Sequence, residues 1–177
     1  MVYHFVILSD EVDNFRREID IDAEATFLDL HNAIIKSCNY KNDEMTSFFI
    51  CESDWTKKTE ITMVDMNEDP TRESGPIMEK THLDDLIETE KQKVLYCFDM
   101  MCDRYLYMQL QSIEVKAHKL KAEVVVSKGN APQQTGNIDD LLSGIDDSGM
   151  YGDEDYDPDE LDLEGYQDLD DIESGGY

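Results

Sequence analysis

The fold is decided by the stretch Thr26-Phe27-Leu28-Asp29-Leu30-His31-Asn32-Ala33-Ile34-Ile35-Lys36-Ser37-Cys38. Apolar residues recur in it at the spacing of one helical face, from Phe27 to Cys38. Thr26 and Asp29 stand at the two positions of a capping box, with Asp in place of the usual Glu. The spacing therefore predicts one amphipathic helix over residues 27–38, the clearest helix in the chain.

Runs rich in β-branched and aromatic residues on both sides of this helix predict strands. Two of them precede it, at Val2 to Leu8 and Phe15 to Ile21, and the short polar turn between them suggests a β-hairpin. The later candidates are strands at 46–52, 60–64, 93–98, 104–115 and 122–127, and one or two helical turns at 81–87. This order is typical of an α+β fold of β-grasp-like type, in which one main helix packs across a mixed sheet.

Alternation within the strands predicts which side chains share a face. Phe15, Ile19 and Ile21 are expected on one face of the second strand. In the segment 104–115, Leu106, Met108 and Leu110 are expected on one side, with Tyr105 and Tyr107 on the other.

The composition changes abruptly after the last predicted strand. Residues 129–137 are rich in Gly, Pro and Gln, which predicts a linker. From Asp139 to Tyr177 there are 16 acidic residues and no Lys or Arg, whereas the whole chain has 42 acidic and 15 basic residues. We therefore expect a domain at 1–128, a linker at 129–137 and an acidic, mostly disordered tail at 138–177.

Apolar residues at the start of this tail suggest a docking segment. Ile138, Leu141, Leu142 and Ile145 fall on one helical face, behind Asn137 as a candidate N-cap. Two helical turns are too short to be stable alone, so this face would need the domain itself or the groove of a partner to dock in. The alternative is a solvated tail with scattered hydrophobic residues.

No motif for a cofactor or a metal stands out. The four cysteines lack CxxC spacing and predict reduced, largely buried thiols, with a zinc site from Cys97, Cys102 and His82 or His118 as the alternative. Residues 153–164 imitate an EF-hand loop but have proline where the sharp turn needs glycine. No phosphate-binding or hydrolase motif occurs, so we predict no cofactor, no metal and no catalytic residue, and an enzyme of unrecognised type stays open.

The net charge of the chain limits the classes of partner that the protein is expected to bind. The net charge of −27 argues against binding nucleic acid or an anionic membrane, both of which need Lys and Arg. Neither a signal peptide nor a membrane-spanning run is evident, so a cytoplasmic location is expected. A strongly acidic chain attracts basic surfaces, which predicts a protein partner of basic character and leaves the oligomeric state open.

Five side chains are candidates for a polar site. His31 lies on the predicted helix, and to act as a general base it would need a partner such as Asp99 or Asp103. The alternative is that His31 edges the core and forms local hydrogen bonds. Arg16 and Arg17 alternate across a strand and cannot both face one ligand, so we expect one to pair with an acid and the other to be solvated.

Several of these segments together resemble a known family. They are Tyr3-His4-Phe5 with Val6 and Leu8, Phe15-Arg16-Arg17-x-Ile19, the run from Ala25 to Ile34, the run from Met45 to Ile50, and Leu95-Tyr96-Cys97-Phe98-Asp99. They are similar to the Ri-plasmid open-reading-frame-three-like family, whose members are often labelled passenger or resolvase-like proteins of an insertion element. The resemblance covers most of residues 1–115 and none of the tail. It implies a β-grasp-like α+β domain and no established activity.

The late hairpin departs from this family. The family typically has Tyr-Asp-Phe-Gly-Asp-x-Trp-x-His there, whereas this chain has Phe98-Asp99-Met100-Met101-Cys102-Asp103-Arg104-Tyr105-Leu106-Tyr107. The aromatic–Asp pair remains, but Gly, Trp and His are missing, so the polar site of the family is not expected intact. A resolvase needs a nucleophilic Ser among Arg residues and a basic surface, and the sequence shows neither arrangement.

Three classes of function follow from the sequence. The leading one is a cytosolic protein-interaction module whose acidic tail recruits a basic partner or keeps the protein in solution. The second is an enzyme or processing factor associated with mobile elements, which a pocket joining His31, Asp99 and an arginine would favour. The third is a DNA-mimic-type binder of a basic protein.

Overall fold

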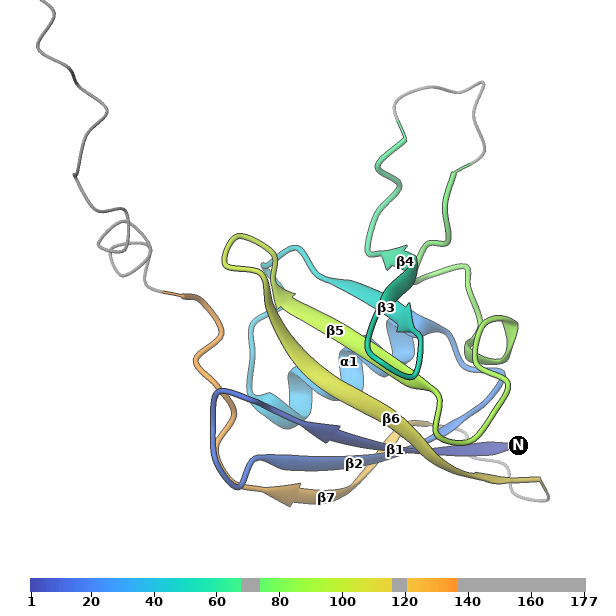
Figure 1. Cartoon of the computed structure of the whole chain (residues 1–177), viewed down its shortest axis with the longest axis horizontal. Coiled ribbons are helices and arrows are strands. Elements are labelled where there is room, and N and C mark those ends of the chain that lie inside the picture. The colour runs from blue at the N-terminus through green and yellow to red at the C-terminus, as the bar shows by residue number, and fades with distance from the viewer. Residues whose placement is uncertain (68–73, 116–120, 137–177) are drawn as a thin grey trace, which may run out of the picture. The chain divides into compact units, whose positions relative to one another are not determined.

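The computed structural model describes residues 1–67, 74–115 and 121–136, which form a seven-stranded sheet with one α-helix across one face (Figure 1). The helix is α1 (Phe27–Cys38), and a short 3-10 helix, η1, covers Leu83–Asp85. The strands are β1 (Val2–Leu8), β2 (Arg16–Asp22), β3 (Ser47–Cys51), β4 (Lys57–Thr62), β5 (Lys93–Asp99), β6 (Arg104–Glu114) and β7 (Glu123–Lys128). The predicted α+β class is confirmed, and each predicted element is present with somewhat shifted ends.

The ends of α1 follow from its sequence. The Thr26 hydroxyl accepts the backbone N–H of Asp29 at 3.2 Å, and the Asp29 carboxylate accepts the backbone N–H of Thr26 at 3.0 Å, so the capping box is formed. Asn39 ends the helix in the left-handed conformation, with φ 57°. The helix therefore begins and ends where local sequence chemistry predicts.

The sheet has the strand order β4-β3-β5-β6-β1-β2-β7, and every neighbouring pair of strands is antiparallel. The predicted mixed sheet is therefore wrong. β1 and β5 do run in the same direction, but β6 lies between them and pairs antiparallel with both. β6 thus separates β1 from β5, and these two strands do not pair with each other.

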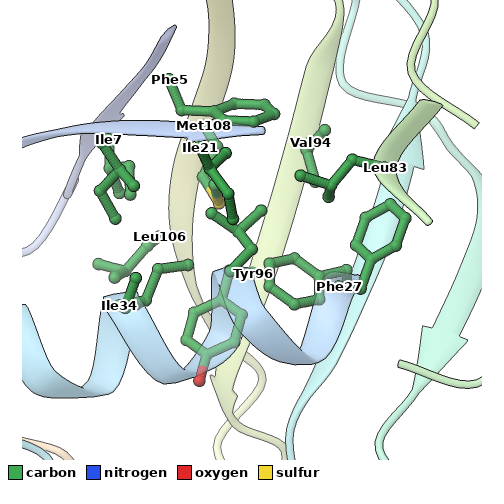
Figure 2. Packing of buried hydrophobic residues seen from close by; sticks show 14 of the residues in the cluster. Phe5, Ile7, Ile21, Phe27, Ile34, Leu83, Val94, Tyr96, Leu106 and Met108 are labelled. Carbon is green, nitrogen blue, oxygen red and sulfur yellow. The ribbon is translucent and has the colours of Figure 1, made fainter. Parts of the chain in front are cut away.

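The core lies between α1 and the sheet (Figure 2). Phe5 and Ile7 from β1, Ile34 from α1, and Tyr96 from β5 are fully enclosed. Leu106, Met108 and Leu110 also point into this core, as the alternation predicts, and burying each such side chain contributes about 1.5–3 kcal/mol. Among the residues described, no helix has the length and apolar character needed to cross a bilayer.

Residues 129–136, which we call the strap, run along the domain surface after β7. Gly129 has φ +70°, and a Cβ there would lie 2.5 Å from a backbone oxygen, so glycine is required. Pro132 is buried, and its carbonyl accepts the Tyr40 hydroxyl at 2.7 Å. The Gln134 side chain bonds both the N–H and the carbonyl of Lys41, each at 2.7 Å. The described part of the predicted linker is therefore held to the domain by specific contacts.

Candidate functional site

The face of the sheet opposite α1, which we call the outer face, carries a cluster of aromatic rings. Cross-strand pairing joins Leu8 to Tyr107, Tyr107 to Leu95 and Leu95 to Phe49 in one row. In Figure 1 the helix lies behind the sheet, so the outer face is turned toward the viewer. Leu8 is 45% exposed and the rings of Phe49 and Tyr107 are half-buried, so this row is partly open to solvent in the described part of the chain.

Two more rings complete what we call the aromatic face, defined as Phe49, Trp55, Tyr105 and Tyr107. Tyr105 lies next to Phe49, with ring centroids 6.3 Å apart. Trp55 comes from the turn after β3 and meets Tyr107 edge-on, with centroids 5.0 Å apart and an interplanar angle of 87°. The spacing is that of favourable edge-to-face pairs, so the rings hold one another in place.

Two lysine side chains lie over these rings. The Lys57 ammonium is 4.6 Å from the centroid of Phe49 and 4.2 Å from that of Tyr105. The Lys93 ammonium is 4.5 Å from the centroid of Trp55. An ammonium at this distance is attracted by the negative face of a ring. The aromatic face therefore already accommodates cations, which the chain itself supplies.

Carboxylates lie at the hydroxyl ends of the two tyrosines. The Tyr107 hydroxyl donates to Asp10 at 3.3 Å, and the Tyr105 hydroxyl donates to Asp103, which is 82% exposed. Burial together with the neighbouring aspartate raises the pKa of each tyrosine. Both hydroxyls therefore remain protonated at neutral pH. Rings flanked by carboxylates suit a cationic group chemically, because both attract positive charge.

The sequence-predicted candidate His31 lies inside the core rather than at a surface. Its Nδ1 is 2.9 Å from the Tyr96 hydroxyl and 3.4 Å from the Thr46 hydroxyl, and its Nε2 is 3.1 Å from the Asn42 side-chain oxygen. Burial lowers the pKa of His31, although the bond to Asn42 opposes this. The ring thus forms hydrogen bonds inside the core, and among the described residues no hydrogen bond or ion pair joins it to a carboxylate.

Asp99 forms a polar corner at the end of β5. One of its oxygens accepts the Cys102 N–H at 3.1 Å, and the other accepts the Gly136 N–H at 2.8 Å and an Arg104 N–H at 3.2 Å. Burial acts to raise the pKa of Asp99, but these donors outweigh it and hold the pKa below its usual value. Arg104 also binds Glu11 through two N–H groups, at 2.9 and 2.6 Å.

Sequence reasoning missed Arg104 and Glu11. They are 93 positions apart, and nothing local marks them as a pair. The Gly136 contact was equally invisible, because it joins the strap to the far end of β5. Asp99, Arg104 and Glu11 each have partners among the described residues, so the corner acts as a structural fastening of the strap.

The side chains of Arg16 and Arg17 lie in different surroundings, one at the surface and one buried. Arg16 pairs with Glu18 at 2.6 Å on the outer face. Arg17 is only 4% exposed, and its guanidinium lies 4.5 Å from the centroid of the Phe15 ring. It donates to four backbone carbonyls, those of Arg16, Ser37, Lys128 and Gly129. The expectation that the second arginine is solvated is therefore wrong, because the end of α1 and the strap close over it.

The five predicted candidates do not form one site. Within the described ranges, no hydrogen bond or ion pair joins the side chains of any two among His31, Asp99, Asp103, Arg16 and Arg17. Direct polar contacts between His31, Asp99 and either of these two arginines are thus not present in the described ranges. No three His, Cys, Asp or Glu side chains in the described parts are placed to hold a metal ion.

Several predictions lie outside the described residues. They are the docking residues Ile138, Leu141, Leu142 and Ile145, the EF-hand-like run at 153–164, and His118 of the alternative zinc site.

The chain was compared with known proteins and with solved structures. A search of the curated proteins finds no match. Among solved structures, the chain is similar to a protein of unknown function, MM3350, from Methanosarcina mazei Go1. The similarity has a TM-score of 0.56 at 19% sequence identity and covers 84% of this chain and 83% of the other. At this identity the likeness shows a shared fold and carries no activity with it.

The family comparison reaches further along the chain than the sequence resemblance suggested. The model of the plasmid pRiA4b ORF-3-like proteins matches residues 2–164, so the match extends beyond the domain and includes much of the acidic region. The prediction that the resemblance stops short of the tail is therefore wrong, whereas the predicted family is confirmed. The chain belongs to the family of plasmid pRiA4b ORF-3-like proteins.

Proposed function

We propose that the protein is a protein-interaction module and that its aromatic face binds a basic segment of a partner protein. The observation that carries this proposal is the pair of lysines on the rings. Lys57 and Lys93 show that ammonium groups fit over Phe49, Tyr105 and Trp55 at 4.2–4.6 Å. A lysine or arginine of a partner would make the same contacts.

The charge of the chain supports a basic partner over an acidic one. The net charge is −27, and Asp10 and Asp103 lie at the edge of the aromatic face. Such a surface steers cationic segments toward it and repels acidic ones. We propose that the 16 acidic residues at 139–177 raise the local concentration of a basic partner.

Two further features accompany the proposal. All four cysteines are free thiols, three of them buried, which supports a reducing, cytoplasmic location. We also propose that the fold is β-grasp-like. In it α1 packs across a sheet in which β1 and β5 run in the same direction, with β6 between them. The alternative of an enzyme has less support, since in the described ranges no hydrogen bond or ion pair joins the side chains of His31, Asp99 and the two candidate arginines to one another.

Trp55 provides a direct test, because it is the only tryptophan of the chain and belongs to the aromatic face. We expect a peptide of alternating lysine and glycine to change the fluorescence of Trp55, and its glutamate counterpart to leave it unchanged. Binding of the basic peptide without a change in Trp55 emission would therefore contradict the proposal, and so would an equal response to the acidic peptide.

Two variants sharpen this test. Lys57→Met removes the cation that occupies the rings of Phe49 and Tyr105, so it should tighten binding of the basic peptide by roughly threefold. Lys58→Met is the matched control, because it makes the same charge change at a neighbouring side chain that pairs with Glu52 at 2.7 Å. If both variants change the affinity equally, the effect is one of net charge and the ring contacts play no part.

A further inference from the structure

β7 is one edge of the sheet. It pairs with β2 on one side, and within the described parts of the chain it is the last strand in the order. Figure 1 shows it along the lower border of the sheet. An edge strand presents backbone N–H and C=O groups to any strand that can approach it. At the middle of this edge Val125 is 42% exposed.

The charged residues at the two ends of β7 lie opposite residues of like charge on β2. Glu123 lies opposite Asp20 of β2, and Lys128 lies opposite Arg16. Like charges directly opposite each other on neighbouring strands are destabilising. Arg16 lies 2.6 Å from Glu18, two residues along the same strand, and the Asp20 carboxylate lies 2.6 Å from His4 Nδ1 of β1. A new strand that pairs with the edge of β7 would lie beside Glu123 and Lys128.

A bulge in β7 places these two charges on the same face of the sheet. Val126 pairs with Glu18 and Val124 pairs with Ile19, so Val125 is the extra residue. In a regular strand, residues five positions apart point to opposite faces. Here Glu123 and Lys128 both point to the outer face, because their partners Asp20 and Arg16 pair with His4 and Leu8 of that face.

The sequence Glu123-Val-Val-Val-Ser-Lys128 is therefore complementary to itself. In an antiparallel pair centred between Val125 and Val126, Glu123 of one strand lies opposite Lys128 of the other, twice by symmetry. Val124 and Ser127 then meet on the helix side, since both pair with inward-facing residues of β2. This register needs the bulge, because opposite residues of an antiparallel pair must share a face.

We propose that β7 pairs antiparallel with β7 of a second copy of this chain, with Glu123 of each copy beside Lys128 of the other. This contact is independent of the aromatic face, which belongs to strands β3 and β6 and to the turn after β3. It gives a two-fold symmetric dimer with a continuous sheet and places an opposite charge next to each end of β7.

Charge-swap variants of the full-length protein test the register. Sedimentation velocity over a series of concentrations in about 0.15 M salt, where the Debye length is about 8 Å, should show a monomer–dimer equilibrium. Glu123→Lys and Lys128→Glu should each weaken the dimer by roughly tenfold, because two attractive pairs become repulsive. The double variant Glu123→Lys/Lys128→Glu should restore wild-type association.

Thermal unfolding separates this effect from damage to the fold. Each single substitution turns a like-charge cross-strand pair, with Asp20 or with Arg16, into an opposite-charge pair, and the melting temperature at a concentration where the protein is monomeric reports any loss of stability in the fold itself. In the dimer, the amide protons of β7 should exchange more slowly as the protein concentration rises. A protein that stays monomeric into the high-micromolar range overturns the proposal, and so does a double variant that associates no better than the single ones.

Discussion

Replacing Asp99 with Asn tests whether the polar corner fastens the strap to the domain. The carboxylate is only 8% exposed and accepts three donors, from Cys102, Arg104 and Gly136. An amide of the same shape keeps one oxygen and turns an NH₂ group toward at least one of these donors. A hydrogen bond to a charged group is worth about 1.5–3 kcal/mol, and the charge that strengthens the remaining contacts is also lost.

We therefore expect Asp99→Asn to lower the free energy of unfolding by about 3 kcal/mol at neutral pH, or the melting temperature by about 10 °C. Urea denaturation followed by circular dichroism measures this change. Asp103→Asn is the matched control, since Asp103 is a nearby aspartate that is 82% exposed, and it should cost less than about 0.5 kcal/mol. Equal losses in the two variants would refute the argument.

The dependence of this effect on pH has a definite sign. The pKa of Asp99 in the folded protein lies below its usual value, so the carboxylate contributes stability that is fully present above the unfolded pKa of about 3.9. That contribution is lost as the pH falls through the lower, folded pKa. The difference between wild type and Asp99→Asn should thus be constant near neutral pH and shrink below about pH 4. A difference that persists unchanged at acidic pH would show that the carboxylate charge has no part in it.

Three other expectations follow from the described contacts. Arg17→Met should cost about 3 kcal/mol of unfolding free energy in denaturant titrations, because four backbone carbonyls lose their donor, whereas Arg16→Met at its exposed position should cost less than about 0.5 kcal/mol. Tyr96→Phe should cost about 1–2 kcal/mol in the same titrations, because it removes the hydroxyl bonded to His31. Iodoacetamide at mildly alkaline pH should alkylate Cys102 in the native protein and the three buried cysteines only after unfolding, as measured by mass spectrometry. The reason is that burial hinders access to these thiols and raises the pKa of Cys97 to about 11. Labelling of a buried cysteine in the native protein would contradict this expectation.

Local features of the fold were accessible from sequence, and long-range pairing was not. The span of α1 follows from its apolar spacing and from the capping box of Thr26 and Asp29, all within a single segment. The order of the strands depends on β6 inserting between β1 and β5, which are more than 80 positions apart. No period in the sequence reports such an insertion, and this is why the sheet was predicted to be mixed.

The same distinction applies to the candidate site. Alternation predicts that Tyr105 and Tyr107 share the side of their strand opposite Leu106, Met108 and Leu110, and the structure agrees. The contacts of these tyrosines with Phe49 and Trp55 depend on how β3 and β5 pair, which the sequence does not reveal. The buried state of Arg17 likewise results from the strap closing over it. A linker-like composition gave no sign of that contact.

The two proposed contacts reinforce each other geometrically. A two-fold axis perpendicular to the sheet keeps the outer faces of both copies on the same side, so a dimer through β7 presents two aromatic faces together. β6 is three strand spacings from β7, which puts the two Tyr107 rows roughly 35 Å apart at about 4.8 Å per strand. A peptide with two basic segments joined by about 40 flexible residues has a matching average span.

Such a divalent peptide should bind the wild-type protein at least tenfold more tightly than a peptide with one basic segment, because the second contact becomes intramolecular. The measurement is Trp55 fluorescence at a protein concentration where the dimer dominates. Lys128→Glu should abolish this gain and leave the affinity for the single segment unchanged, since Lys128 lies on β7, away from the aromatic rings. The double variant Glu123→Lys/Lys128→Glu should recover it. A gain that survives Lys128→Glu would mean that the divalent peptide uses two sites on one copy, and dimerisation would then have no role in binding.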